Sequence, residues 1–357
     1  MKTTMNKDNY DIEFDRSKIY EKLDYLPQLG SYKGKLPWKV QQQIAATNGI
    51  QYVDRIGKLK GYPKYELPVN KVEKGLMLDI GTGWGRWLVA GAEKGYIPVG
   101  IDLRLEFCLA ARQTLLAQGK NGYTVVADLK DIPFQEMLFD LVWSFSVIQH
   151  THHDRMLRCL QAINRILAPG GFTKLEFPNK NGIRNKTGPA RTNAKFANDY
   201  NSWKVRYYTI REYRNYFMDI FKNFNFTNHS FLGIGVLKED LKYVSLKNKL
   251  LCSISLLGSL LTKIVPGLKW ISDSIYINAV KENEGIVNSN LVSFLKAHQA
   301  EPTNNLNIVH LLKCPLTGKA LLVSVDKKFI TTLDGKVQYP IKDGIPILIR
   351  TEIISTT

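Results

Sequence analysis

Between Gly75 and Phe177 the sequence alternates short apolar runs with stretches of helical spacing, and this alternation limits the fold more than any other feature. The apolar runs predict strands over residues 76–80, 97–101, 123–127, 140–145 and 172–177. Apolar residues at helical spacing predict helices over 104–118 and 154–168, and residues 84–94, which end before Gly95, are the third predicted helix. Uninterrupted alternation of strand and helix is typical of a parallel sheet with helices on both faces. The sequence therefore predicts an α/β, doubly wound, Rossmann-like domain.

After Phe177 the alternation of strands and helices is less regular, but it continues. It predicts a helix over 208–224, a sixth strand over 226–231 and a seventh strand over 272–281. Residues 250–267 form an apolar stretch that is too short and too interrupted to span a bilayer, which takes about 20 apolar residues. A buried or capping helix is the first interpretation of this stretch. Peripheral contact of residues 250–265 with a membrane is the alternative.

The chain divides into four segments that differ in composition and in residue pattern. Mixed aromatic and glycine-rich sequence predicts a cap of short helices and loops over residues 1–74, and a polar stretch predicts a linker over 282–305. The main domain is predicted over 75–281, and a compact segment follows over 306–357.

Composition and cysteine usage are those of a globular protein, with 44% hydrophobic and 23% charged residues among 357. The first fifteen residues contain no apolar leader-like run. The cysteines show no paired spacing; they are Cys108, Cys159, Cys252 and Cys314. Free thiols in a reducing compartment, and hence a cytoplasmic location, are the expectation.

The stretch LDIGTGWGRW (78–87) joins the first predicted strand to the first helix. A dinucleotide-binding turn has the pattern Gly-x-Gly-x-x-Gly, but here Arg86 occupies the third glycine position and Gly85 falls one residue early. Asp79 followed by Gly81, Gly83 and Gly85 fits S-adenosylmethionine better, because the helix that follows offers free N–H groups to a carboxylate. A dinucleotide remains the alternative ligand.

Two further aspartates follow the second and third predicted strands. Asp102 can accept both hydroxyls of a ribose, since a carboxylate has two acceptor oxygens. Asp128, with the Leu129 N–H beside it, can accept from an adenine amino group. A ligand lying across the carboxyl ends of neighbouring strands is expected in an open α/β sheet.

Taken together, five motifs in order make residues 75–178 resemble the class I S-adenosylmethionine-dependent methyltransferases of the broad methyltransferase type 11 kind. The matching pieces are LDIGTGWGRW, GIDL, VVADLKDIPF, FDLVWSFSVIQH and RILAPGGF. The resemblance implies a seven-stranded sheet with an antiparallel seventh strand, and SDSIYINAVK (272–281) fits that strand. The predicted cofactor-binding residues are Asp79, Gly81, Thr82, Gly83, Gly85, Asp102, Leu103, Asp128, Leu129 and Ser144.

Methyl transfer needs a base only where the acceptor is weakly nucleophilic. Histidine suits a hydroxyl acceptor because its ordinary pKa lies near neutrality. The segment after the fourth strand contains His150, His152 and His153, and His150 is the predicted catalytic base. The alternative is a loop histidine that makes only local hydrogen bonds. The Asp/Asn-Pro-Pro-aromatic motif of many methylases that act on the amino groups of nucleic-acid bases is absent there, since residues 144–147 are SFSV.

Residues 309–349 consist of short apolar runs separated by turns, including the hairpin signal LDGKV. Their ends, LLKCPLTGKAL and YPIKDGIPILI, resemble the Trm112-like family of small proteins that bind and stabilise methyltransferases. Cys314 has no partner cysteine, Thr317 stands where one is expected, and one thiolate cannot build a zinc site. We expect a small β-rich Trm112-like domain without metal, acting as a built-in activator.

The chain carries a net charge of +17, concentrated between residues 180 and 250, where fourteen Lys and Arg face five Asp and Glu. A basic surface attracts phosphates of any source. The sequence predicts methylation of an oxygen or nitrogen atom on a small molecule, a sugar or a lipid-linked intermediate. RNA or a translation-related protein is the alternative acceptor, and a binding protein without catalysis is a third interpretation.

Overall fold

The computed structural model describes residues 35–36, 38–48, 52, 55–70, 75–187, 205–232, 237–282, 305–350 and 354–355. The predicted linker 282–305 and the first half of the predicted cap therefore lie almost wholly outside the described residues.

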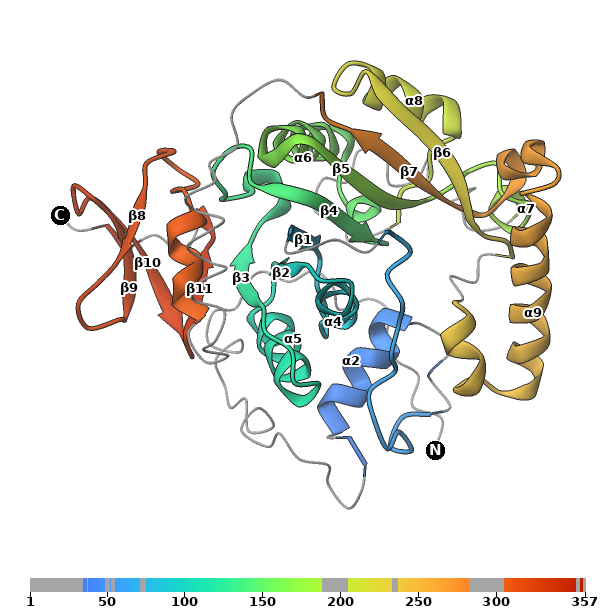
Figure 1. Cartoon of the computed structure of the whole chain (residues 1–357), viewed down its shortest axis with the longest axis horizontal. Helices are drawn as coiled ribbons and strands as arrows, with labels where there is room; N and C mark the ends of the chain where they lie inside the picture. The colour runs from blue at the N-terminus through green and yellow to red at the C-terminus, as the bar shows by residue number, and fades with distance from the viewer. Residues whose placement is uncertain are drawn as a thin grey trace.

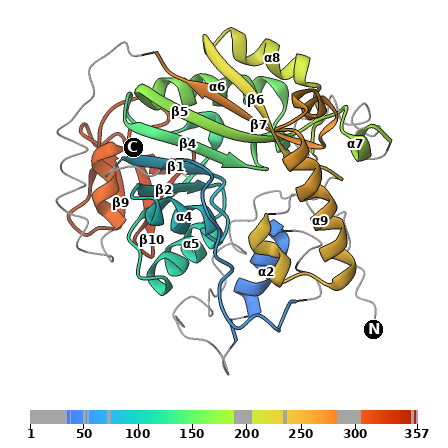
Figure 2. The ribbon, with the colours of Figure 1, turned by 45° about the vertical axis from the view of Figure 1, so that its right-hand side comes forward.

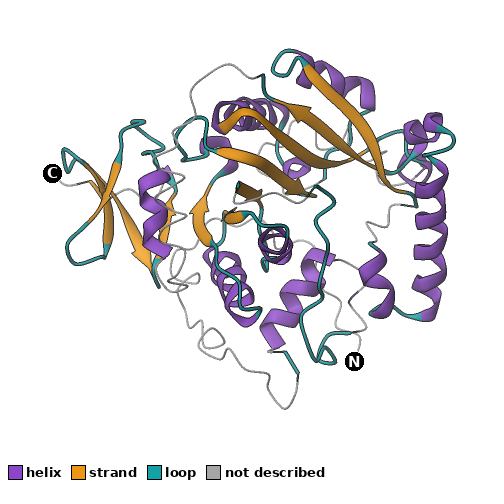
Figure 3. Cartoon of the chain, in the orientation of Figure 1, coloured by secondary structure: helices purple, strands orange, loops and turns teal. Residues whose placement is uncertain are grey.

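The molecule is built on one mixed sheet with helices on both faces (Figures 1 and 3). The strands that form its α/β part are β1 (Leu76–Ile80), β2 (Ile97–Asp102), β3 (Tyr123–Ala127), β4 (Phe139–Phe145), β5 (Leu167–Pro178), β6 (Asn223–Ser230) and β7 (Ser274–Val280). Their order across the sheet is β6-β7-β5-β4-β1-β2-β3. β7 is antiparallel to β5, whereas the strands from β5 to β3 are parallel. The predicted α/β class is confirmed.

Helices connect these strands in the predicted alternation. The α-helices of this part are α4 (Arg86–Glu93), α5 (Leu105–Ala117), α6 (His153–Ile166), α7 (Ile183–Thr187) and α8 (Ile210–Met218). Short 3₁₀ turns follow two of the strands, η1 (Leu129–Asp131) and η2 (Ile148–His150). The helix predicted over 208–224 is too long, because the backbone from Asn223 onward pairs with β7 and belongs to the sheet.

The described part of the amino-terminal region packs over the first strand-to-helix loop. Helix α2 (Trp38–Asn48) contributes Val40 and Ile44 to a cluster that also contains Trp84 and Trp87. Tyr52 and Tyr65 both donate hydrogen bonds of 2.8 Å to Asp240, which lies in the 3₁₀ turn η4 (Lys238–Lys242). The amino-terminal segment is thus tied both to the sheet and to the segment after β6.

After η4 the chain forms α9 (Leu246–Leu261) and the 3₁₀ segment η5 (Pro266–Ile271) at the β6 end of the molecule (Figures 1 and 2). The leucines of α9 are largely exposed, so of the predicted buried or capping helix only the buried form is wrong, because α9 covers the end of β6 through Ser255 and Ser259. No helix in the described part of the chain has the length and apolar character needed to cross a membrane.

The sheet does not end at β3, as a seven-stranded sheet would. It continues through the carboxy-terminal strands β11 (Ile345–Leu348), β10 (Val337–Lys342), β9 (Phe329–Thr332) and β8 (Leu321–Val323), and β12 (Ile354–Ser355) pairs with β10. Ile347 and Leu348 of β11 pair in parallel with Val126 and Ala127 of β3. The carboxy-terminal segment is therefore an extension of the main sheet on the side opposite α9 (Figure 1).

The buried side chain of Asn305, at the start of η6 (Asn305–Leu311), joins this segment to β3. Its Oδ1 accepts from the Thr124 N–H at 2.8 Å, and its Nδ2 donates to the carbonyls of Thr124 and Gly344 at 2.8 and 3.0 Å. Ile308, Leu311 and Leu312 belong to the same hydrophobic core as β1 and β4. Polar and apolar contacts together hold the carboxy-terminal segment on the sheet.

We expect Asn305→Ala to lower the free energy of unfolding by about 2–4 kcal/mol, because it leaves the buried Thr124 N–H and carbonyl unpaired. Urea denaturation followed by fluorescence measures the change. Asn307→Ala on the same 3₁₀ helix is the matched control, since in the described part of the chain the Asn307 side chain makes no hydrogen bond. Equal stability of the two variants would contradict this account of the junction.

Candidate functional site

The loop after β1 is folded back against β2. The N–H groups of Gly81 and Thr82 both donate to the Ile101 carbonyl, at 2.8 and 3.0 Å. Gly81 has φ +75°, and a Cβ there would lie 2.2 Å from Val147 Cγ2. Gly85 has φ +88°, and its Cβ would lie 2.7 Å from the Ala111 backbone. Backbone conformation favours glycine at all three predicted positions, since Gly83 has φ +52°, and close packing also requires it at Gly81 and Gly85, whatever ligand binds.

Asp79, in β1, is fully buried, and neither of its carboxylate oxygens has a hydrogen-bond partner among the described residues. Burial raises the pKa of Asp79 to about 7, against the lowering effects of the neighbouring Thr82 hydroxyl and of the Arg86 charge. An unpartnered buried carboxylate is costly, so a ligand that donates hydrogen bonds or carries a cation fits this position. The amino group of a methionine moiety is such a donor.

Asp102 and Asp128 stand at the ends of β2 and β3, as predicted. Asp102 is half-buried and accepts from the N–H groups of Gly83 and Arg104, each at 3.1 Å. Burial raises the pKa of Asp102 to about 6, although those two N–H groups lower it. Asp128 accepts from the Lys130 N–H at 3.0 Å and forms an ion pair with the Lys130 ammonium at 3.1 Å. Each carboxylate retains free lone pairs for a ligand.

The other predicted cofactor residues surround the same edge of the sheet. Thr82 is buried, and its hydroxyl has no hydrogen-bond partner among the described residues. Ser144 is also buried and donates to the Ile80 carbonyl at 3.2 Å, which ties β4 to β1. Leu103 and Leu129 are half-buried and pack against the core beside β2 and β3.

His150 ends η2, directly after β4, and is half-buried. Its carbonyl accepts from the Arg206 guanidinium at 2.8 Å, and its N–H donates to the Val147 carbonyl at 3.0 Å. The predicted catalytic histidine therefore lies on the expected side of the sheet, and its main chain is fixed by local hydrogen bonds.

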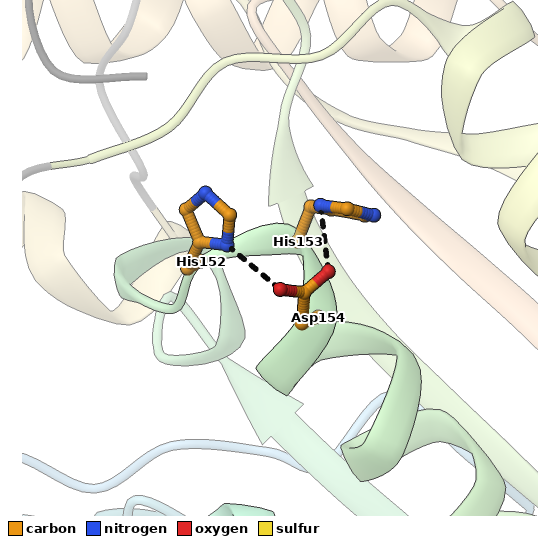
Figure 4. Close-up of side chains that lie close together, drawn as sticks. All are labelled: His152, His153 and Asp154. Carbon is orange, nitrogen blue, oxygen red and sulfur yellow. Dashed lines mark ion pairs between the residues drawn. The ribbon is translucent and has the colours of Figure 1, made fainter. Parts of the chain in front are cut away.

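Next to it, His152, His153 and Asp154 lie at the start of α6 with their ligating atoms within 4.8 Å of one another (Figure 4). The carboxylate of Asp154 lies 3.6 Å from His152 Nδ1 and 3.0 Å from His153 Nδ1. His153 and Asp154 are exposed, and clusters of this kind are common on protein surfaces without an ion. The sequence predicts no metal, and we assign none to this cluster.

A second set of buried polar side chains, which sequence analysis did not identify, lies where β4 and β5 end. Glu176 near the end of β5 is 4% exposed. It accepts from the Ser146 hydroxyl at 2.5 Å and from the Ser274 hydroxyl of β7. Burial raises the pKa of Glu176 to about 7, although the Ser146 hydrogen bond lowers it. Glu176 is thus half protonated near neutral pH, which is the range that a general acid or base needs.

Arg86, the first residue of α4, is 8% exposed and forms no ion pair with any described residue. Its guanidinium carbon lies over three aromatic rings, 5.4 Å from the centre of Tyr65, 5.2 Å from Trp87 and 4.8 Å from Phe145. Cation–π contacts offset part of the cost of burying its charge, but the five N–H donors of a guanidinium favour an anionic partner.

His229 on β6 and Tyr276 on β7 complete this group. Their ring centres are 4.7 Å apart, and His229 meets Phe145 edge-on at 5.0 Å. Burial and the charges of Arg86 and Lys174 lower the pKa of His229 to about 3, so the ring stays neutral. The Nε2 atom of His229 and the hydroxyl of Tyr276 have no hydrogen-bond partner among the described residues.

We name Arg86, Glu176, His229 and Tyr276 the buried polar cluster. One signal in the sequence could have identified part of it, because Glu176 is an acidic residue between the apolar Leu175 and Phe177 of a predicted strand. His229 and Tyr276 carry no such signal, since only the pairing of β6 and β7 with β5 brings them together.

Comparison with known proteins identifies the α/β part. A family model described as a methyltransferase domain matches residues 77–171. A tRNA (guanine-N(7)-)-methyltransferase of Mycoplasmopsis pulmonis is 31% identical over 185 residues, which cover 45% of this chain and 87% of that protein.

Two further relatives match shorter stretches. A tuberculostearic acid methyltransferase of Mycobacterium tuberculosis is 32% identical over 106 residues, which cover 29% of this chain but only a quarter (25%) of that protein's length. A UPF0434 protein of a Marinomonas species is 36% identical over 53 residues, which cover 15% of this chain and 82% of that protein.

The similarity is not confined to residues 77–171, which the family model matches. The tRNA (guanine-N(7)-)-methyltransferase matches this chain over 87% of its own length. The chain belongs to the class I S-adenosylmethionine-dependent methyltransferases, and S-adenosylmethionine is its methyl donor.

Proposed function

We propose that the methyl donor binds across the carboxyl ends of β1, β2 and β3. The carboxylate of Asp79 would take the amino group of its methionine part, Asp102 the ribose hydroxyls, and Asp128 the adenine amino group. The loop 81–85 would carry the methionine part, and Leu103, Leu129 and Ser144 would line the same edge. The unpartnered carboxylate of Asp79 is the observation that best supports this arrangement.

Once bound, S-adenosylmethionine supplies an activated methyl group on a sulfonium centre. What remains for the protein is to hold the acceptor atom in line with that methyl, and such positioning can lower a barrier by about 7–11 kcal/mol. A base is needed only for an acceptor that must lose a proton. Glu176, with a pKa of about 7, and the predicted His150 are the two candidate bases after β4 and β5.

We further propose that the acceptor carries an anionic group, a phosphate or a carboxylate, which Arg86 binds. The observation that carries this proposal is a buried guanidinium that is surrounded by aromatic rings and has no ion pair in the described part of the chain. The unpartnered Nε2 of His229 and hydroxyl of Tyr276 offer the acceptor further hydrogen bonds. The function that this cluster supports best is methylation of an oxygen or nitrogen atom on a small molecule, a sugar or a lipid-linked intermediate.

Methylation of RNA is the second candidate, supported by the relative named as a tRNA methyltransferase and by the basic stretch 180–250. In that case the carboxy-terminal segment 306–357 would be a Trm112-like activator fused to the catalytic domain 75–281. The match to a UPF0434 protein over 53 residues supports this assignment weakly. Saturable tRNA binding that falls steeply with salt and transfer of labelled methyl to tRNA would favour this candidate.

We expect Asp79→Asn to raise stability and to abolish cofactor binding. The native pKa of about 7 exceeds the usual value of 3.8, so the ionised Asp79 costs stability increasingly as pH rises from about 4 to 7. The asparagine variant should be more stable by about 1–4 kcal/mol at pH 8, and the gain should vanish below pH 4. Denaturation at both pH values tests this, with the exposed Asp219→Asn as the control. A loss of stability in the Asp79→Asn variant at pH 8 would contradict the view that the buried, ionised Asp79 destabilises the free protein.

We expect Asp102→Ala to weaken binding of both S-adenosylmethionine and S-adenosylhomocysteine at least tenfold, because the variant removes an acceptor from the ribose site. Calorimetric titration of both ligands measures this. Asp219→Ala, an exposed aspartate at the end of α8, is the control, and should retain wild-type affinity. Full affinity in the folded Asp102→Ala protein would exclude the proposed cofactor position.

We expect sulfate, whose charge is constant in this range, to bind the S-adenosylhomocysteine complex about tenfold more tightly at pH 6 than at pH 8. The reason is that Glu176, with its pKa of about 7, is neutral at the lower pH and repels the anion at the higher one. Arg86→Gln should abolish sulfate binding, and Glu176→Gln should remove its pH dependence. If Arg86→Gln instead weakens S-adenosylhomocysteine binding itself, Arg86 holds the carboxylate of the cofactor and not the acceptor.

A further inference from the structure

The outer face of α9 is apolar, whereas the residues that the helix buries are the small Cys252 and Ser255, so its large apolar side chains face outward, unlike those of a normal surface helix. The exposed side chains are Leu246, Leu250, Ile254, Leu257, Leu260 and Leu261 on α9, followed by Ile264, Val265, Trp270 and Ile271. Spacings of three and four residues place the side chains of α9 along one side of the helix. We name these ten residues the α9 ridge.

Hydrogen bonds fix the helix in this orientation. The Ser255 hydroxyl is buried; it accepts from the Phe231 N–H at 3.1 Å and donates to the Phe231 carbonyl at 2.9 Å. Ser259 donates to the His229 carbonyl at 3.2 Å. Gly258 lies so close to the Phe231 ring that a Cβ would approach it to 2.8 Å. Because small polar residues anchor the inner face, the helix cannot rotate to bury its leucines.

Within the segment 241–272, which carries the α9 ridge, the charged residues are all basic. Residues 241–272 contain five lysines, at positions 242, 247, 249, 263 and 269, and no Asp or Glu. In the described part of the chain, Lys247, Lys249 and Lys263 are exposed and form no ion pair. An apolar strip flanked only by lysines is complementary to a surface that is apolar inside and negatively charged outside.

We propose that the α9 ridge docks on a membrane surface that contains anionic lipids. The helix has 16 residues and is about 24 Å long, so it would lie in the plane of the interface and not across the bilayer. Trp270 and the lysines would lie at the level of the headgroups. A second copy of this chain fits less well, because two α9 ridges facing each other would bring their lysines together without any acidic residue between them.

Docking at this face would place the methyltransferase site beside the membrane. Ser259 of α9 contacts the backbone of His229, whose ring belongs to the buried polar cluster. A lipid-linked acceptor would therefore reach that cluster from the membrane side. This consequence rests on the proposed function, whereas docking of the α9 ridge does not.

The test is flotation of the full chain with vesicles of phosphatidylcholine alone or with about 30% phosphatidylglycerol, at low and high salt. We expect binding to the anionic vesicles that weakens as salt rises. The double variant Leu250→Gln and Leu257→Gln should weaken it about tenfold or more, because both leucines leave water on docking. The triple variant Lys247→Gln, Lys249→Gln and Lys263→Gln should lose the preference for anionic vesicles.

A matched control removes exposed apolar side chains from the opposite side of the molecule. Leu322→Gln with Val325→Gln, at 48% and 104% exposure, should bind vesicles like the wild type. A dye on Leu257→Cys, attached selectively because the native cysteines are buried, should shift its emission to the blue when vesicles are added. Calorimetric binding of S-adenosylhomocysteine by every variant checks the fold and tests the cofactor site independently of lipid.

Absence of binding to anionic vesicles, or binding that the α9 variants leave unchanged, would overturn the proposal. A dimer in sedimentation that dissociates in the double leucine variant would also overturn it, because the α9 ridge would then be covered by a second copy.

Discussion

The central position of β1 in the sheet is the constraint on which the rest of the site depends. β1 is hydrogen-bonded on both sides, to β2 and to β4, so the chain that leaves it can only pass over the carboxyl edge of the sheet. The same edge receives Asp102 after β2, Asp128 after β3 and Ser146 after β4. Parallel register therefore gathers groups that are far apart in the sequence around one place above β1.

The burial of charged groups at this edge lowers the stability of the free protein and leaves these groups available to a ligand. Asp79, Asp102 and Glu176 all have a pKa raised by burial, and Arg86 is buried without a salt-bridge partner among the described residues. Such groups reduce the stability of the free protein. A ligand that supplies their missing partners relieves this destabilisation when it binds, and its affinity is higher for that reason. The aromatic rings around Arg86 limit the cost while the site is empty of ligand.

Much of the architecture follows from periodicity, because buried strands and amphipathic helices impose their own spacing on the sequence. The strands from 76–80 to 172–177 and the three aspartates at their ends were predictable in this way. Pairing between distant segments was not: nothing local in Ile345–Leu348 indicates that it lies beside β3, and nothing in 223–225 distinguishes strand from helix before β7 is present. For the same reason, His150 could be named from a local pattern, whereas His229 and Tyr276 required the assembled sheet.

The pairing of β11 with β3 has a consequence for how the protein is made. Residues 76–280 supply strands β1 to β7, but Val126 and Ala127 of β3 gain their pairing with β11 only when Ile345–Leu348 has been synthesised. Unpaired strand edges are sites of aggregation. We therefore expect a chain released before residue 345 to expose this edge, which the carboxy-terminal segment covers in the native structure.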